Sequence, residues 1–338
     1  MWLSHSNKKI PGGSGFGPSL VTPLFLLLLV FCAPLFVAAQ STEPIETLRI
    51  DTDLVNLNVS VFNHDMKRAA APLNQKDFAV FENGTPQEIS FFASAEAPFD
   101  LVLLLDLSGS TADKLDVIRQ SSKHFVDAVR PGDRVAILTF GTDVRAISLL
   151  TMDRDGLKKG IERIEKPSGG TNFWDALRFV YEHVLVQSRN ENRRSAVIVM
   201  TDGIDNALPD VAGEGSRTSF DELLQIVAKN DSIVLPIYLD TEKETLKLRQ
   251  ATLVTFSLAR NYLARLAEET GGNFMYWARK VKDLDGVYEQ VIRDLSMVYS
   301  IGYRPTDRAR DGRWRSVSVR LIQHPELAPR SKRGYYAK

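Results

Sequence analysis

One stretch decides the fold class: Leu101-Val-Leu-Leu-Leu-Asp106-Leu-Ser108-Gly-Ser110. Its five consecutive aliphatic residues predict a strand buried on both faces, as at the centre of a parallel sheet. The strand ends at a carboxylate, which two hydroxyls and a glycine follow. A helical pattern comes next, with its marker residues three and four apart: Leu115, Ile118, Ser122, Phe125 and Val129. Polar groups between a central strand and a helix lie where open α/β sheets bind ligands.

The polar end of this strand offers oxygen atoms only. Asp106, Ser108 and Ser110 therefore suit a hard cation such as Mg²⁺, Ca²⁺ or Mn²⁺. Serines in this position also serve as caps of the helix that follows. On these residues alone, a cation site and a simple helix cap are both open.

The overall composition is that of a folded globular protein. The chain has 338 residues, of which 44% are hydrophobic and 25% are charged, so it has room for two domains. Basic and acidic residues both number 42. This balance gives no global basic excess, so we expect no nucleic-acid partner.

The amino terminus has the features of a signal peptide. Lys8 and Lys9 precede an apolar run from residue 24 to residue 37, and Val37-Ala38-Ala39 supplies the small residues of a cleavage site. We therefore expect residues 1–39 to be removed by cleavage after Ala39. The mature protein is then predicted to be secreted, or to reside in the periplasm or cell envelope.

A retained membrane anchor is the alternative interpretation of this segment. Pro23 and Pro34 keep the clean apolar run below spanning length, so we expect no stable membrane span after cleavage. Cys32, the only cysteine, lies inside the same run. The mature chain is therefore predicted to be held by its core without disulfides.

The sequence before residue 98 predicts a small all-β unit, residues 40–97. Apolar and polar residues alternate from Leu54 to Phe62, which indicates a half-buried strand. Another strand is expected at 78–82, and Asn83-Gly84 predicts a hairpin turn after it. We expect residues 89–92 to be the partner strand of that hairpin.

From residue 98 to residue 297, strands alternate with helices. This order predicts an α/β domain with a doubly wound, mostly parallel sheet flanked by helices. Further strands are expected at 134–140, 146–150, 195–200, 233–239 and 274–277. Helices are expected at 157–164, 174–186, 220–228, 261–269 and 284–298.

The last segment, residues 298–338, returns to a β pattern. Apolar residues alternate from Tyr299 to Tyr303 and from Val317 to Leu321, and Asp311-Gly312 marks a turn between them. We expect a hairpin that packs with the amino-terminal β unit, so that the α/β domain is inserted in a sandwich-like β unit. The basic, aromatic stretch 330–338 is either one more edge strand or a frayed tail.

Two further motifs make the first stretch more specific. Ser168-Gly-Gly170-Thr171 forms a loop ahead of a helix, and Thr201-Asp202-Gly203 follows another buried strand. If that strand neighbours the first, Asp106 and Asp202 converge from adjacent strands. A cluster of five oxygen-bearing side chains would result: Asp106, Ser108, Ser110, Thr171 and Asp202.

The order and spacing of these five residues resemble the metal-ion-dependent adhesion site of the von Willebrand factor type A family. The resemblance covers about residues 98–297. It implies a doubly wound sheet with the cation at its upper edge, direct ligation by Ser108, Ser110 and Thr171, and ligation by the two aspartates directly or through water. Mg²⁺ is the expected cation, with Mn²⁺ and Ca²⁺ as alternatives.

A site of this kind indicates binding of an acidic partner. Two carboxylates balance the charge of a dication, and neutral hydroxyls add ligands without overcompensating it. A position left to water can then accept an Asp or Glu side chain of a protein partner. The flanks, Asp77 to Ile89 and Tyr299 to Pro305, are similar to those of secreted bacterial von Willebrand factor A-related proteins of the kind found in acidobacteria.

Enzymatic activity is not expected. A phosphatase of the haloacid dehalogenase type needs a second Asp where this chain has Ser108, and neither Gly-x-Ser-x-Gly nor His-Glu-x-x-His occurs. A metal-dependent hydrolase and a purely structural envelope module are the alternative functions. Asp205 either contacts the cation through water or lies in a solvated loop, and Asp143 is expected in a surface turn. The sequence does not indicate an oligomeric state.

Overall fold

The computed structural model describes residues 54–63, 72–111, 114–166, 169–188, 193–247, 251–272 and 275–337. These residues all belong to one compact unit, residues 51–338. The predicted signal peptide and its cleavage site lie outside the described residues. Within the described part of the chain, no helix has the length and apolar character needed to cross a membrane.

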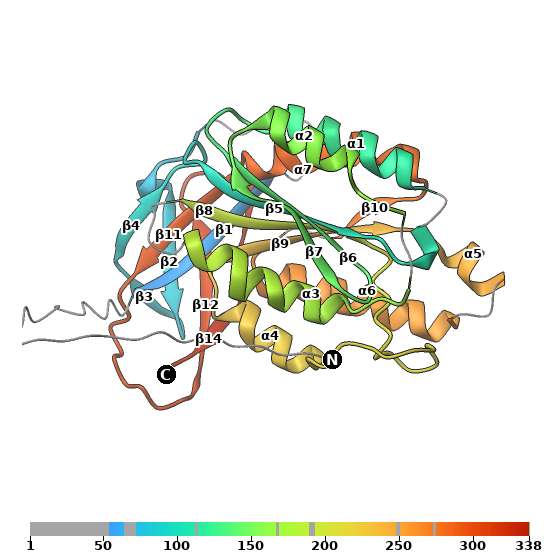
Figure 1. Ribbon diagram of the computed structural model, residues 1–338. Helices are drawn as coiled ribbons and strands as arrows, with labels where there is room; N and C mark the ends of the chain where they lie inside the picture. Colours follow the sequence, from blue (N-terminus) through green and yellow to red (C-terminus); the bar gives the residue numbers. More distant parts are fainter. Residues whose placement is uncertain are drawn as a thin grey trace, which may run out of the picture. The chain divides into compact units, whose positions relative to one another are not determined.

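A six-stranded sheet forms the centre of the α/β domain (Figure 1). Every neighbouring pair is parallel except β6 and β7, which run antiparallel. The predicted doubly wound, mostly parallel sheet is therefore confirmed. In spatial order the strands are β10 (Tyr276–Ala278), β9 (Ser232–Leu239), β8 (Arg194–Thr201), β5 (Phe99–Asp106), β6 (Arg134–Phe140) and β7 (Val144–Thr151).

Helices cover both faces of this sheet, as Figure 1 shows. Alternate residues of β5 enter two separate apolar cores, one under each layer of helices, so the strand is fully buried. The first layer contains α1 (Leu115–Ala128), α2 (Arg154–Glu162) and α7 (Leu284–Leu295). The second contains α3 (Phe173–Phe179), α4 (Phe220–Ala228) and α6 (Leu253–Glu269), while the short α5 (Glu242–Lys247) lies beyond β9.

Three helix predictions need correction. Helix α6 begins at Leu253, two turns before the predicted start, because Thr252 and Thr255 form a capping box there. Helix α3 passes into a π-helical turn at Val180–Val184 and then a 3₁₀ turn, so the predicted 174–186 helix is not regular. Helix α7 ends at Leu295 because the chain then turns into the next strand. The short α5 was not predicted.

The β domain, residues 54–98 and 297–337, consists of two four-stranded sheets. Their facing side chains form a third apolar core that includes Leu57, Phe78, Tyr299 and Tyr303. One sheet has the order β13 (Leu327–Arg330), β1 (Val55–Asn63), β11 (Val298–Tyr303), β4 (Ile89–Ala93). The other has the order β14 (Gly334–Tyr336), β12 (Trp314–Leu321), β2 (Phe78–Glu82), β3 (Thr85–Gln87).

Two strand pairings differ from the sequence prediction. β11 and β12 do not form a hairpin with each other, because β11 pairs with β1 and β4 while β12 pairs with β2 and β14. Asn83 and Gly84, both with positive φ, do form the predicted turn, but the partner of β2 is the short β3 and not residues 89–92. The basic carboxyl-terminal stretch is an edge strand rather than a tail. The alternation of apolar and polar residues predicts which face of a strand is buried, but it does not predict which strand lies next to it in the sheet.

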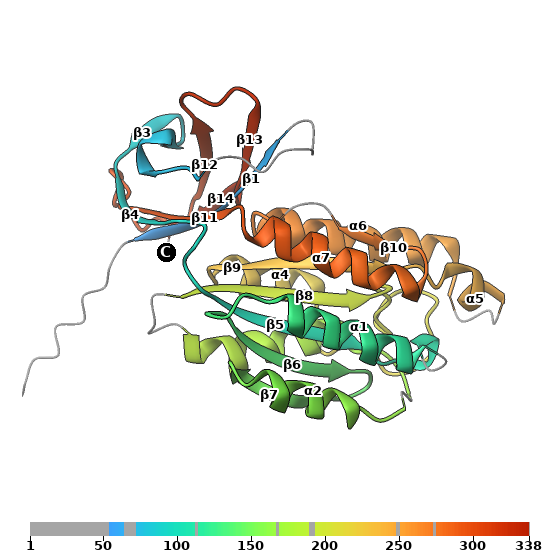
Figure 2. The same ribbon diagram turned by 90° about the horizontal axis from the view of Figure 1, so that it is seen from above.

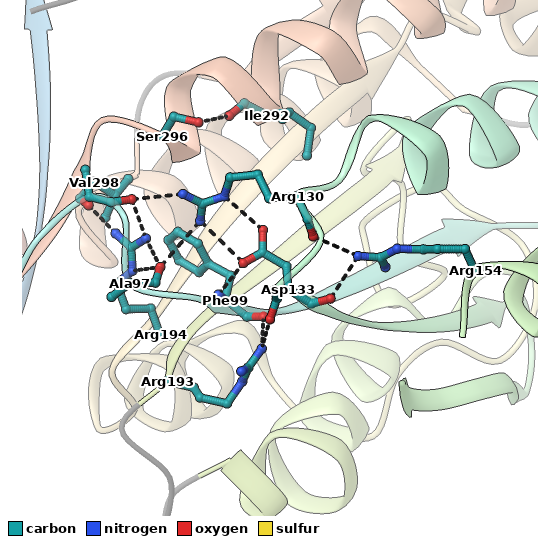
Figure 3. Close-up of polar contacts among 12 residues, drawn as sticks. Ala97, Phe99, Arg130, Asp133, Arg154, Arg193, Arg194, Ile292, Ser296 and Val298 are labelled. Atoms are coloured by element: carbon teal, nitrogen blue, oxygen red, sulfur yellow. Dashed lines mark hydrogen bonds and ion pairs between the residues drawn. The ribbon is translucent and has the colours of Figure 1, made fainter. Parts of the chain in front are cut away.

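Arginines hold the two linkers that join the domains (Figure 3). Arg194, only 4% exposed, donates hydrogen bonds to the carbonyl oxygens of Ala95, Ala97 and Val298. Its guanidinium also lies 3.9 Å from the ring centre of Phe99. Since Ala95 and Ala97 precede β5 and Val298 follows α7, one side chain secures both crossings between the domains.

Candidate metal site

The candidate site lies at the carboxyl end of the central strands. β5 and β8 are parallel neighbours, with Leu105 opposite Met200 in the register. Asp106 is the last residue of β5, and Asp202 directly follows β8. Figure 2 shows β6 and β8 running in the same direction, away from the β domain. The two carboxylates therefore meet at one edge of the sheet, as the sequence predicts.

Asp106 has no exposed surface. Its Oδ1 accepts a hydrogen bond from the backbone N–H of Ser108 at 3.0 Å, and its Oδ2 accepts one from the Thr201 hydroxyl at 2.6 Å. Burial, and then the negative charge of Asp202, raise the pKa of the Asp106 carboxyl to about 7. A cation bound at this point would therefore stabilise the ionised forms of both carboxylates.

A residue that follows a third strand, β9, donates a hydrogen bond to Asp202. Asp202 is 3% exposed, and its Oδ2 accepts a 2.7 Å hydrogen bond from the hydroxyl of Thr241, which follows the end of β9. Its Oδ1 accepts from the backbone N–H of Ile204 at 3.1 Å. The carboxylate is consequently fixed in place by both its own loop and its neighbour.

A tight turn follows β5. Ser110 lies within this turn, and Ser108 directly precedes it. Gly109–Thr111 form a 3₁₀ turn, and the Thr111 hydroxyl donates to the carbonyl oxygens of Asp106 and Ser108. Ser108 is 4% exposed, whereas the side chain of Ser110 lies outside what the structure describes. Helix α1 has Lys114 as its N-cap, without a side-chain capping bond. The helix-cap interpretation of the two serines is therefore wrong.

The loop that carries Thr171 adjoins this turn. A Cβ placed on Gly109 would lie 3.8 Å from the carbonyl oxygen of Gly169. Gly169 has φ +91°, and a side chain there would meet the Thr142 hydroxyl at 2.6 Å. The same hydroxyl accepts a hydrogen bond from the backbone N–H of Gly170 at 3.0 Å. Glycine at position 169 thus allows the loop to approach Thr142 closely.

Thr171 is fixed by Asn206, a residue that the sequence did not single out. The backbone N–H of Thr171 donates to Asn206 Oδ1 at 3.0 Å, and the Asn206 N–H donates to the Thr171 carbonyl at 2.9 Å. Asn206 Nδ2 donates in turn to the Ala212 carbonyl. The reciprocal pair joins loops 35 positions apart in the sequence, so no local pattern could reveal it.

Asp205 lies in a buried network of hydrogen bonds beside the site. It is completely buried, so the solvated-loop interpretation is wrong. Oδ1 accepts from the N–H groups of Ala207 and Ser216, and Oδ2 accepts from the Trp174 N–H and the Ser216 hydroxyl. These four donors show that Asp205 organises the loop between β8 and α4. Asp143 is exposed between β6 and β7, as expected.

The donor set suits a hard dication. Two buried carboxylates raise each other's cost of ionisation, which a cation between them would offset, and the nearby hydroxyls are neutral oxygen ligands. Among the described residues, no three His, Cys, Asp or Glu side chains are grouped in the manner of a metal site. The candidate therefore depends on hydroxyls as much as on carboxylates.

These features define an α/β domain whose parallel sheet presents buried carboxylates and hydroxyls at the ends of its central strands. Residues 100–228 match the family model of the von Willebrand factor type A domain. The α/β domain accordingly has the fold of a von Willebrand factor type A domain, and residues 100–228 are the part that matches the family.

Three similar proteins are between 16% and 24% identical to this chain. A UPF0353 protein of Nocardia farcinica is 24% identical over 218 residues, which are 61% of this chain and 62% of that protein. The match thus spans less than two thirds of that relative. Proximal thread matrix protein 1 from the mussel byssus, solved with a zinc-occupied MIDAS motif, has a TM-score of 0.47 at 17% identity, covering 62% of this chain and 48% of that one. BatB from Bacteroides thetaiotaomicron, a conserved hypothetical protein, has a TM-score of 0.42 at 16% identity, covering 58% of this chain and 98% of that one.

Proposed function

We propose that this protein is a secreted or envelope-associated module that binds a protein partner through a divalent cation. Five residues would hold the cation: Asp106, Ser108, Ser110, Thr171 and Asp202. Mg²⁺ is the proposed ion, with Mn²⁺ and Ca²⁺ as alternatives. The observation that supports this proposal is the pair of buried carboxylates, Asp106 and Asp202, on adjacent strand ends beside a hydroxyl-bearing turn.

The bound cation would supply strong attraction for a partner's Asp or Glu carboxylate at a coordination position otherwise left to water. The chain's own residues supply the rigidity. Thr201 and Thr241 each donate to one of the carboxylates, and Asn206 fixes the backbone of Thr171. Ligands held in this way lose little conformational entropy when a cation binds.

We infer a binding role rather than catalysis. The oxygen atoms of Asp106 and Asp202 already accept hydrogen bonds from hydroxyls and backbone N–H groups. These contacts would fix both carboxylates as cation ligands, and the second position after Asp106 is Ser108, where a phosphatase of the haloacid dehalogenase type needs a second Asp. The hydrolase alternative predicts cation-dependent cleavage of a phosphate or ester substrate that is lost in Asp106→Asn.

Export is part of the proposal. The charged and apolar pattern of residues 1–39 supports cleavage after Ala39, so that Gln40 would begin the mature protein. The similarity of the flanks to secreted bacterial proteins of the acidobacterial kind points in the same direction. Amino-terminal sequencing of the protein recovered outside the cytoplasm tests this; a chain that keeps residues 1–39 would contradict it.

The cation site is tested by thermal unfolding with Mg²⁺, Mn²⁺, Ca²⁺ or a chelator. A ligand at about 100 times its Kd stabilises the folded state by about 2.7 kcal/mol. Wild type should therefore gain stability with the preferred cation, and Asp106→Asn, which keeps the side-chain shape, should not. Asp143→Asn removes an exposed carboxylate near the same edge and should behave as wild type.

Equal melting of wild type and Asp106→Asn in every condition would contradict the cation site and favour the structural-module alternative. Partner binding is then tested by capture from envelope extract with Mg²⁺ and release by chelator. Replacement of the partner's contact Asp or Glu by Asn or Gln should abolish capture. Partner capture that is unchanged by the chelator would contradict the proposed mode of recognition.

A further inference from the structure

The balanced net charge of the chain conceals a strong separation of charge. Residues 304–338 carry 10 of the 42 basic residues but only 3 of the 42 acidic ones. This segment therefore has a net charge of +7, and the remaining 303 residues have a net charge of −7. Eight of its ten basic residues are arginines. Such asymmetry is typical of a protein with a localised polyanion-binding surface.

The arginines concentrate in residues 304–313, the loop between β11 and β12, which we call the arginine loop. Its exposed basic side chains are Arg304, Arg308, Arg310 and Arg313. The loop also contains two acids, Asp307 and Asp311. Both form ion pairs with Arg315, which is only 2% exposed, and Asp311 also pairs with Arg313. Arg315 also donates to the carbonyl oxygen of Ala309 at 2.8 Å. With four arginines against two acids, residues 304–313 have a net charge of +2, and the buried Arg315 offsets part of the charge of the two acids.

The arginine loop is anchored at both ends. The Thr306 N–H donates to Gln87 Oε1 at 3.0 Å, and Gln87 Nε2 donates back to the Thr306 hydroxyl at 3.1 Å. The Gly312 N–H donates to the Ala337 carbonyl, and the Ala337 N–H donates to the Arg313 carbonyl. In Figure 1 the loop extends from β11 past the carboxyl-terminal β14. An anchored loop loses less conformational entropy when its arginines bind a ligand.

Two exposed aromatic side chains adjoin the loop. Trp314 is 43% exposed and Tyr336 is 60% exposed, and their ring centres lie 5.0 Å apart across the β12–β14 pair. A Cβ on Gly334 would lie 2.6 Å from the Trp314 ring, so glycine there permits this arrangement. We call Trp314 and Tyr336 the aromatic pair. Side chains of this type have an apolar body and a polar tip, which suits the boundary between lipid and water.

We propose that the arginine loop and the aromatic pair bind the surface of an anionic phospholipid membrane. The planar guanidinium matches phosphate oxygens with two parallel hydrogen bonds, which lysine cannot do. Trp and Tyr would insert among the headgroups beside those phosphates. Nucleic acid offers the same phosphates, but the predicted export of the chain favours a lipid surface.

This inference does not depend on the cation site. The arginine loop belongs to the β domain, whereas the candidate ligands lie at the far, carboxyl ends of β5 and β8. A chelator or the Asp106→Asn substitution should leave membrane binding unchanged. Failure of one proposal can therefore be distinguished from failure of the other.

The test is co-sedimentation with vesicles made of phosphatidylcholine alone or of an equimolar mixture with phosphatidylglycerol. The loop variant combines Arg304→Ser, Arg308→Ser and Arg313→Ser. Its matched control combines Arg279→Ser, Lys280→Ser and Lys282→Ser, which removes three exposed cations from the α/β domain. At about 1 kcal/mol for each cation at an anionic surface, the loop variant should partition roughly 100-fold more weakly. The control should partition as wild type does.

The aromatic contribution is tested with Trp314→Ala and Tyr336→Ala together, which should weaken binding without changing its dependence on salt. Melting temperatures of all variants establish that each is folded. Equal losses in the loop variant and its control would overturn the proposal, and so would equal binding to both kinds of vesicle. Displacement by inorganic phosphate, or tighter binding to a single-stranded oligonucleotide than to vesicles, would assign the surface to a different ligand and also overturn it.

Discussion

Replacement of Gly271 by Ala measures how tightly the two domains fit together. Gly271 follows the end of α6 with φ +74°, a conformation that is unfavourable for a residue with a side chain. A Cβ at this position would lie 2.7 Å from the carbonyl oxygen of Asn58 in β1 and 3.0 Å from Cα of Ser331. Both neighbours are backbone atoms of the β domain. The methyl group can therefore be accommodated only if the domains shift apart.

Gly312→Ala is the matched control for this substitution. Gly312 has nearly the same φ, +71°, but a Cβ there would meet nothing within 4 Å. The conformational penalty of about 1–2 kcal/mol should therefore be common to both variants. The effect of alanine on the unfolded chain is common to both as well. The difference between the two variants isolates the collision with the β domain.

Overpacking of this kind costs about 1–3 kcal/mol. We expect Gly312→Ala to lose about 1–2 kcal/mol of unfolding free energy and Gly271→Ala to lose about 2–5 kcal/mol. In a thermal scan, each kcal/mol corresponds to about 2–4 °C in a unit of this size. Urea titration monitored by circular dichroism gives the free energies directly. If Gly271→Ala costs no more than Gly312→Ala, the end of α6 does not pack tightly against β1 and the reasoning is wrong.

Further predictions concern the candidate metal site and its supporting loops. The raised pKa of Asp106 makes the cation-free protein lose stability as the pH rises toward about 7, above which the loss is complete. The unfolding free energy of wild type minus that of Asp106→Asn should therefore fall from about pH 5 to pH 7 and level off by pH 8 in urea titrations, and added cation should remove this fall. Asn206→Ala should cost about 1–2 kcal/mol and reduce the cation-induced rise in melting temperature, since Thr171 loses its backbone partner. Asp205→Asn should cost about 2–4 kcal/mol because its amide nitrogen cannot accept from two of the four donors around it, whereas Asp143→Asn should change stability by less than about 0.5 kcal/mol in the same urea assay.

The sequence predicts the α/β domain well because its signals are local. An unbroken aliphatic run such as 101–105 has only one reasonable place, the middle of a sheet covered on both faces. The same run fixes the position of Asp106 at the strand end. Thr201-Asp202-Gly203 follows a second run of the same kind, so the meeting of the two carboxylates follows from the parallel order of the strands.

What the sequence does not predict depends on partners that are distant in the chain. Asn206 and Thr241 are ordinary polar residues until the fold brings them to Thr171 and Asp202. Likewise, the alternation in β11 and β12 gives their buried faces correctly, but the choice between a hairpin and two separate sheets depends on the amino-terminal strands that compete for them.

The two proposed binding surfaces should act independently of each other, and this can be measured. The chain passes from the β domain into β5 at Phe99 and reaches the candidate cation site at Asp106, seven residues later. At about 3.3 Å per residue this strand separates the two regions by about 23 Å, well beyond the 7–10 Å at which effects usually couple. Cation-induced stabilisation measured on vesicle-bound protein should therefore equal that of free protein within about 0.5 kcal/mol. A cation that strengthens or weakens vesicle binding several-fold would contradict this independence and require a conformational link through the sheet or through the linkers that Arg194 holds.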